Sequence, residues 1–240
     1  LANLARVISW SGKIEDAVPP AEEALTYGVD DPETISSASI VLATWWAMEG
    51  DDVRERQYYR MALNALPRDS YTHWRIGLRA FDRQPPEVEL GCAHAFFASV
   101  YWKGARRDAP HQVLGGVLAS RGHWKAAFSH LLEARSIDPS NPETASLLTR
   151  VSQQLGPAAS SVSTPKVTVD TYPSGAIRRI IQVKLDPAGK AIPDGIWTEW
   201  YEGGEPSRYR MMSNGAPAGD DVTWNAEGRM TTRIGSGSKQ

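Results

Sequence analysis

An internal repeat dominates the first 155 residues of the chain. Three series of identical residues recur there, and successive members of each series lie 38 and then 72 residues apart. The series are Leu4, Leu42 and Leu114; Gly12, Gly50 and Gly122; and Ala24, Ala62 and Ala134. A period of about 36 residues, with one degenerate copy between the second and third members, accounts for every position. A period of this size is typical of a solenoid of stacked hairpins.

Each copy has the pattern of a helical hairpin. Apolar residues recur at helical spacing on both sides of Gly122, with Leu114 and Leu118 before it and Ala127 and Ala134 after it. Glycine suits the point where the chain reverses, and alanines let two helices approach closely. The repeat therefore predicts pairs of antiparallel helices.

Signals for helix ends support this interpretation. Pro-Glu-Thr recurs at 32–34 and 142–144, and the preceding Asp31 and Asn141 can each cap a helix that begins with proline. Pro19-Pro20 is a departure, because two prolines inside an expected helix should kink or shorten it.

The best copy resembles the tetratricopeptide repeat. That family favours Leu-Gly or Leu-Ala in its first helix, glycine at the turn, two alanines in its second helix and a final Asp-Pro. The matching residues are Leu114-Gly115, Gly122, Ala127, Ala134 and Asp138-Pro139. The copy around Trp74 is degenerate, with Gln84-Pro85-Pro86 in place of its turn. The resemblance implies an α-solenoid of about four hairpins over residues 1–155, closed by a polar capping helix at Pro142–Leu155.

The composition changes after residue 155. Residues 156–166 are small, serine-rich and contain two prolines, which predicts a linker. Residues 167–233 alternate apolar and polar side chains between two-residue turn signals such as Asn214-Gly215, which predicts antiparallel β-hairpins. Residues 234–240 have the composition of a disordered tail.

The hairpin region resembles the bacterial variant of the MORN repeat, found in antitoxin-like proteins. Asp194-Gly195-Ile196-Trp197 is the strongest match, and Gly175, Gly204 and Gly228 follow one another at 29 and 24 residues. The resemblance implies hairpins whose aromatic side chains stack on the next hairpin in a single elongated sheet. A few short hairpins are marginal alone, so we expect the sheet to pack on the helices or on a partner. The expected fold class is α + β, with two domains.

Composition excludes several classes of protein. The chain has 240 residues, 26 basic and 28 acidic side chains and a net charge of −2, which argues against a nucleic-acid binder. No apolar run approaches the roughly 18 residues of a transmembrane helix. Because the chain begins at Leu1, we expect that a signal peptide, an anchor or another upstream segment has been removed.

No residue pattern indicates catalysis, a metal site or a cofactor. The five histidines lack a metal-binding spacing, and Cys92 and His94 face apart on a helix, which favours Cys92 as a small core residue. Glu199 and Glu202 would face opposite sides of a strand. We therefore expect a protein that is not an enzyme and binds neither metal nor cofactor.

The tetratricopeptide resemblance also implies a concave groove that binds a partner protein. Carried over by register, its residues are Arg6, Ser9, Trp10, Thr44, Met48, Trp74, Gln112 and Ser120, and Trp45 is added as a tryptophan expected to face outward. This groove is mostly neutral and aromatic, which favours an apolar or helical partner segment.

These features predict a non-catalytic scaffold or accessory subunit. It would assemble or stabilise a larger, membrane-associated bacterial complex in the periplasm or envelope; a cytoplasmic location is the alternative. A second hypothesis is a soluble antitoxin-like regulator. A third is a binder of glycans or lipid headgroups through a surface of Tyr172, Trp197, Trp200, Tyr201 and Trp224.

Overall fold

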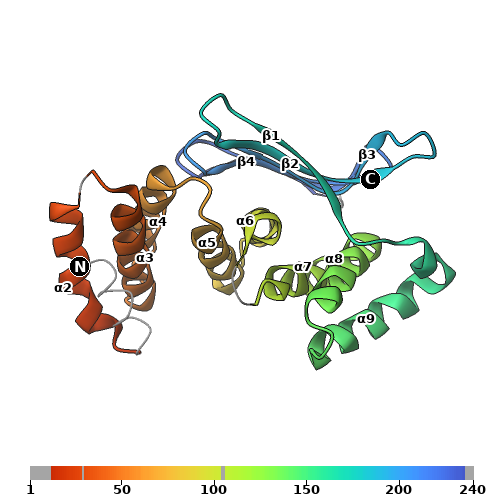
Figure 1. Cartoon of the computed structure of the whole chain (residues 1–240), viewed down its shortest axis with the longest axis horizontal. Coiled ribbons are helices and arrows are strands. Elements are labelled where there is room, and N and C mark those ends of the chain that lie inside the picture. The colour runs from red at the N-terminus through yellow and green to blue at the C-terminus, as the bar shows by residue number, and fades with distance from the viewer. Residues whose placement is uncertain (1–11, 29, 104–105, 236–240) are drawn as a thin grey trace. The chain divides into compact units, whose positions relative to one another are not determined.

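The computed structural model describes residues 12–28, 30–103 and 106–235. Within these ranges the expected α + β layout is confirmed, with helices first and an antiparallel sheet after them (Figure 1). The helices are α2 Ile14–Tyr27, α3 Pro32–Met48, α4 Asp52–Ala65, α5 Ser70–Asp82, α6 Val88–Tyr101, α7 Asp108–Ser120, α8 Trp124–Ile137 and α9 Pro142–Leu155. A short 3₁₀ helix, η1, covers Gly156–Ser161 in the expected linker.

The chain divides into two compact units. The first contains the residues up to Thr72 together with Glu202–Glu205, and the second contains His73–Tyr201 and the residues from Pro206 onward. In the first unit the Arg60 guanidinium lies 3.6 Å from the Glu205 carboxylate. The second unit holds both the later helices and the sheet, so residues 156–166 connect two parts of one unit.

Glycine turns and buried alanines build the helical hairpins as the repeat predicts. Gly12, Gly50 and Gly122 have φ of +83°, +76° and +79°, a conformation that costs other residues about 1–2 kcal/mol. The repeat alanines are all buried at helix contacts: Ala17, Ala24, Ala62, Ala127 and Ala134.

The predicted helix starts are also confirmed. The Asp31 carboxylate accepts the backbone N–H groups of Glu33 and Thr34 at the start of α3. The Asn141 side chain accepts the equivalent N–H groups at the start of α9. Each cap satisfies two donors that the helix itself cannot pair.

Helix α2 differs from the expectation that Pro19 and Pro20 would shorten it. The helix runs through both prolines and keeps 14 residues, as many as α4, α6 and α8. Ala17, Ala21 and Ala24 are buried against α3, and this packing holds the helix despite the two missing N–H donors.

Six strands form one antiparallel sheet in chain order. They are β1 Lys166–Thr171, β2 Ile177–Leu185, β3 Ala191–Trp200, β4 Pro206–Ser213, β5 Ala216–Trp224 and β6 Met230–Ile234. Gly175, Gly204 and Gly228 supply positive φ at three of the turns, as expected. Hydrogen bonds repeat from one hairpin to the next: the Tyr172 hydroxyl donates to the Trp200 carbonyl at 2.8 Å, and the Tyr201 hydroxyl to the Trp224 carbonyl at 3.0 Å.

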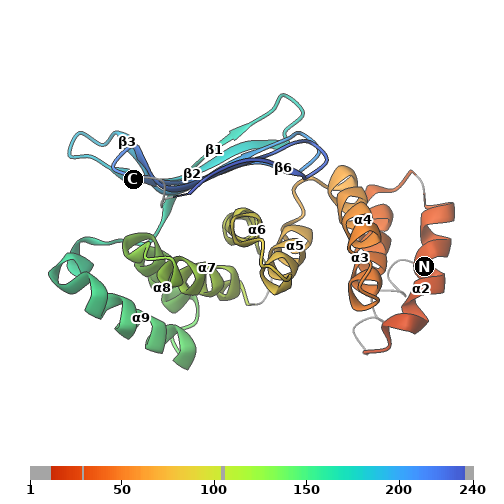
Figure 2. The ribbon, with the colours of Figure 1, turned by 180° about the vertical axis from the view of Figure 1, so that it is seen from behind.

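One face of the sheet packs on helices of the second unit (Figures 1 and 2). This confirms that the sheet shares its core with the helices: Phe96 and Phe97 of α6 and Leu131 of α8 belong to one cluster with the strand residues Ile180, Ile196, Trp200, Tyr209 and Val222. The opposite face carries charged side chains, and its Asp221 carboxylate accepts hydrogen bonds from Arg208 and Arg210. Across the described residues, no helix is both long and apolar enough to span a membrane.

Candidate functional site

Two buried histidine pairs repeat at the same register of successive hairpins. The Nδ1 atoms of His73 and His94 are 2.9 Å apart, and those of His111 and His130 are 3.0 Å apart. In each pair the first histidine is the fourth residue of its helix and the second is the seventh residue of the next. All four side chains are buried.

Burial lowers the pKa of three of these histidines, His94, His111 and His130, so their rings are neutral at pH 7. The pKa of His111 falls to about 4, and those of His94 and His130 fall well below the usual value. His111 also hydrogen-bonds to the backbone of Ser99. A neutral ring has one N–H, so His111 uses it on the Ser99 carbonyl and accepts the Nδ1–H of His130. A hydrogen bond with the Gln182 side chain partly offsets the effect of burial on the pKa of His130.

The pairs lie between the helices and the sheet. The ring of Trp200 from β3 meets His73 and His94 edge-on, at centroid distances of 5.0 and 5.3 Å. Beside His130, the Ser129 hydroxyl donates to the Ser163 carbonyl at 2.7 Å, and the Gln182 amide of β2 lies 3.4 Å from the same hydroxyl. Each pair is thus a hydrogen bond between two polar side chains inside the core. Over the described ranges, no group of three or more His, Cys, Asp or Glu residues converges as metal ligands would.

Sequence reasoning missed these pairs because it compared histidines with one another along the chain rather than along the repeat. The signal was present: His73 and His111 are 38 residues apart, and His94 and His130 are 36 apart, close to the repeat period. The predicted role of Cys92 agrees with the structure, since its thiol is buried and burial raises its pKa to about 12. Such a thiol carries almost no thiolate and is a poor nucleophile.

An ion-pair network connects α6, the end of α7 and the last two strands. The Glu89 carboxylate accepts from the guanidinium groups of Arg121 at 2.6 Å and Arg233 at 2.8 Å. Arg121 also contacts the carboxylate of Asp220. Both carboxylates are buried. A buried carboxylate is tolerated only when its cationic partners are present. The network therefore holds α6, the end of α7 and the last two strands together.

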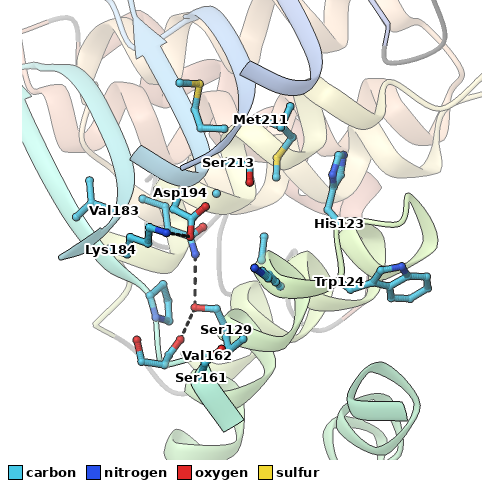
Figure 3. A pocket seen from close by; sticks show the side chains of 18 of the residues that line it. His123, Trp124, Ser129, Ser161, Val162, Val183, Lys184, Asp194, Met211 and Ser213 are labelled. Carbon is cyan, nitrogen blue, oxygen red and sulfur yellow. Dashed lines mark hydrogen bonds and ion pairs between the residues drawn. The ribbon is translucent and has the colours of Figure 1, made fainter. Parts of the chain in front are cut away.

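A cavity of about 460 Å³ lies in the second unit between the start of α8, residues 161–165 and strands β2 to β5 (Figure 3). Its wall combines the hydrogen-bonded Ser129 and Gln182 with the ammonium of Lys184, which is 3.9 Å from the Asp194 carboxylate. Trp124 and Met211 add apolar surface. The Ser129 hydroxyl donates to a backbone carbonyl rather than to a histidine, so this arrangement suits binding better than nucleophilic attack.

The predicted groove residues lie in different environments. Arg6, Ser9 and Trp10 fall outside the described residues. Three lie in the first unit: Thr44, whose hydroxyl bonds to the Ile40 carbonyl, half-buried Trp45, and exposed Met48. Three lie in the second unit: Trp74 meets Trp102 edge-on at 6.0 Å, Gln112 is buried beside Asn141, and Ser120 is exposed with its hydroxyl on the Val117 carbonyl.

The predicted aromatic surface of the strands is divided between environments. Trp200 and Trp224 are buried among the core residues that face the helices. Tyr172 and Tyr201 are half-buried and bonded to the carbonyls of those two tryptophans. Trp197 is half-buried; its indole N–H donates to Glu199, and the Arg179 guanidinium lies 5.3 Å from its ring centroid. The five side chains therefore do not form one continuous binding platform.

The tip of the α3–α4 hairpin carries exposed apolar side chains. Met48 at the end of α3 is 67% exposed and Val53 at the start of α4 is 78% exposed. Beside them, the Arg54 guanidinium lies 4.1 Å from the centroid of the Trp46 ring. Apolar side chains within a charged rim are typical of protein contact sites. We call Trp46, Met48, Val53 and Arg54 the hairpin tip.

Comparisons with known proteins add no family to this description. No protein-family model matches the chain, and no curated protein matches it.

Proposed function

We propose that this chain is a non-catalytic interaction protein, a scaffold or accessory subunit of a larger bacterial complex. The observation that carries the proposal is the hairpin tip, where Met48 and Val53 hold large apolar surfaces in water. A partner that covers these side chains would remove that surface from water. The burial would stabilise the complex by about 25 cal/mol for each Å² of apolar surface.

The repeat architecture supports this function. The left-handed glycines at the helical turns, the buried alanines and the repeated Tyr–Trp bonds support the proposal of tetratricopeptide-like hairpins followed by a MORN-like sheet. Both repeat types build extended surfaces from identical units, and such surfaces commonly serve as docking sites. We further propose that the complex lies at the bacterial envelope, which fractionation of native cells would test.

Photo-cross-linking in the native cells tests the proposed function. A photoreactive residue at Met48 should yield a defined cross-linked partner. The same residue at exposed Gln153 of α9 is the control and should yield much less. The double variant Met48→Ser/Val53→Ser should lower recovery of that partner about tenfold, while Gln153→Ser leaves it unchanged. Equal cross-linking at both positions, or unchanged recovery with the tip variant, would reject the proposal.

A further inference from the structure

Strand β1 is an open edge of the sheet. It pairs with β2 on one side, and within the described residues no strand pairs with its other side. All six of its residues are exposed. An edge strand in this state presents unpaired backbone N–H and C=O groups, which can pair with another strand.

The side chains of β1 divide between the two faces of the sheet. Val167 and Val169 stand opposite Gln182 and Ile180, on the side that faces the helices, and each is 37% exposed. Lys166, Thr168 and Asp170 are on the other face, where Asp170 pairs with Arg179. Apolar and charged groups are thus sorted by face along a strand whose outer edge is paired with no other strand of the described residues.

We propose that β1 pairs antiparallel with β1 of a second copy of this chain, about a twofold axis through Thr168. This register keeps each face continuous, because residues that face one another across an antiparallel pair lie on the same side. It places Val167 against Val169 of the second copy, and Lys166 against Asp170 of the second copy. Both contacts occur twice, so the interface is self-complementary and closes as a dimer.

Charge selects this register. A lysine on an edge strand ordinarily discourages pairing, but here the same face carries an acidic residue four positions later. No ion pair to Lys166 is formed within the described chain, and both hydrogen bonds from Arg179 end on the Oδ2 atom of Asp170. The Asp170 carboxylate can therefore accept a second cation through Oδ1. If the twofold axis passed through Val169 instead, no residue of the second copy's β1 would lie opposite Lys166, and the contact between opposite charges would be lost.

The other sheet edge, β6, is less suited to self-pairing. Its Arg233 is bound to Glu89, and pairing centred on Thr232 brings Met230 against Ile234 with no opposite charges. Pairing of β1 with β6 of another copy would be head-to-tail and would continue into open-ended assemblies.

A cysteine at the twofold axis tests the geometry. In an antiparallel pair, facing Cα atoms are about 4.5–5.5 Å apart, within reach of a disulfide. The full-length Thr168→Cys variant should form a disulfide-linked dimer under mild oxidation. Thr149→Cys, at an exposed threonine of α9, is the matched control. The native Cys92 is buried and should not contribute.

Complementary charge variants test the pairing in solution by sedimentation velocity. Lys166→Glu and Asp170→Lys each place like charges across the axis, and each should weaken the dimer about tenfold. An equal mixture of the two variants restores opposite charges at both contacts and should recover the dimer. A monomeric wild type with no preferential Thr168→Cys cross-link would overturn the proposal. So would open-ended polymers, or single variants whose mixture fails to recover the dimer.

Discussion

The Nδ1 atoms of His111 and His130 lie 3.0 Å apart inside the core, so one ring donates its Nδ1–H to the Nδ1 atom of the other. His73 and His94 repeat the arrangement one hairpin earlier. A further proton on the accepting Nδ1 atom of either pair would place two N–H donors against each other and leave a charge among apolar side chains.

Lowering the pH should therefore reduce the free energy of unfolding of the second unit. The unfolded chain takes up protons near the ordinary histidine pKa of 6.5, whereas folded His111 does so only near 4. Between these values the unfolded state binds more protons, so the free energy of unfolding falls as the pH decreases. The shift of His111 alone corresponds to about 3 kcal/mol.

Urea titrations between pH 7 and 4 measure this effect. The variant His111→Gln/His130→Leu should lose part of the pH dependence, whatever its stability at pH 7. The exposed-site variant Gln153→Leu is the control and should keep the wild-type slope. Equal slopes in all three proteins would contradict the neutral-pair assignment.

Gly195 should be intolerant of a side chain. Its φ is +128°, and a Cβ atom there would overlap the Gln182 carboxamide. We expect Gly195→Ala to reduce the free energy of unfolding by about 2–4 kcal/mol. Gly189 has φ of +80° but open space around it, so Gly189→Ala isolates the backbone cost of about 1 kcal/mol. Equal losses for the two variants in urea unfolding would show that Gln182 can move aside.

Removal of Glu89 should destabilise the second unit. Glu89→Ala leaves the guanidinium groups of Arg121 and Arg233 without the buried carboxylate that they share. Because both arginines remain partly exposed to water, we expect a loss of about 2 kcal/mol rather than the full cost of a stranded buried charge. Thermal unfolding measures it, with exposed Glu23→Ala of α2 as the control. A loss no larger than that of the control would mean that the network adds nothing to stability.

The repeated tyrosine bonds should contribute equally. Tyr172→Phe and Tyr201→Phe each remove one hydroxyl that donates to a tryptophan carbonyl, worth about 1 kcal/mol. The two sites share no partner, so the double variant should lose the sum of the single losses. Chemical unfolding of the three variants would test this, and a variant as stable as wild type would show that water replaces the lost donor.

Repetition made much of the fold predictable from sequence. The roles of Gly122 and Asn141 could be predicted from the residues around them, because a turn glycine and a helix cap depend on neighbouring residues alone. The expectation that Pro19 and Pro20 would shorten their helix was wrong, because packing of α2 on α3 outweighs a local preference. The contact of His94 with Trp200 could not be predicted, because it depends on which face of α6 meets the sheet.

The candidate site was less predictable than the fold, because it too depends on which side chains the packing buries. Met48 was selected by its place in the repeat, and the structure finds it exposed, but Trp200 and Trp224 were selected as aromatic and are core residues. A hydrophobic side chain has the same appearance in sequence whether it fills a core or meets a partner. Only the three-dimensional arrangement separates the two uses.

The assignment of Glu202–Glu205 to the first unit has a consequence for synthesis. A ribosome releases residues in order, and N-terminal regions ordinarily fold before the rest emerges. Here the Arg60–Glu205 contact cannot form until Glu205, far downstream of Arg60 in the chain, has been made. A nascent chain stalled between α4 and β4 would expose an incompletely paired first unit to chaperones, so translation speed over that interval bears directly on yield.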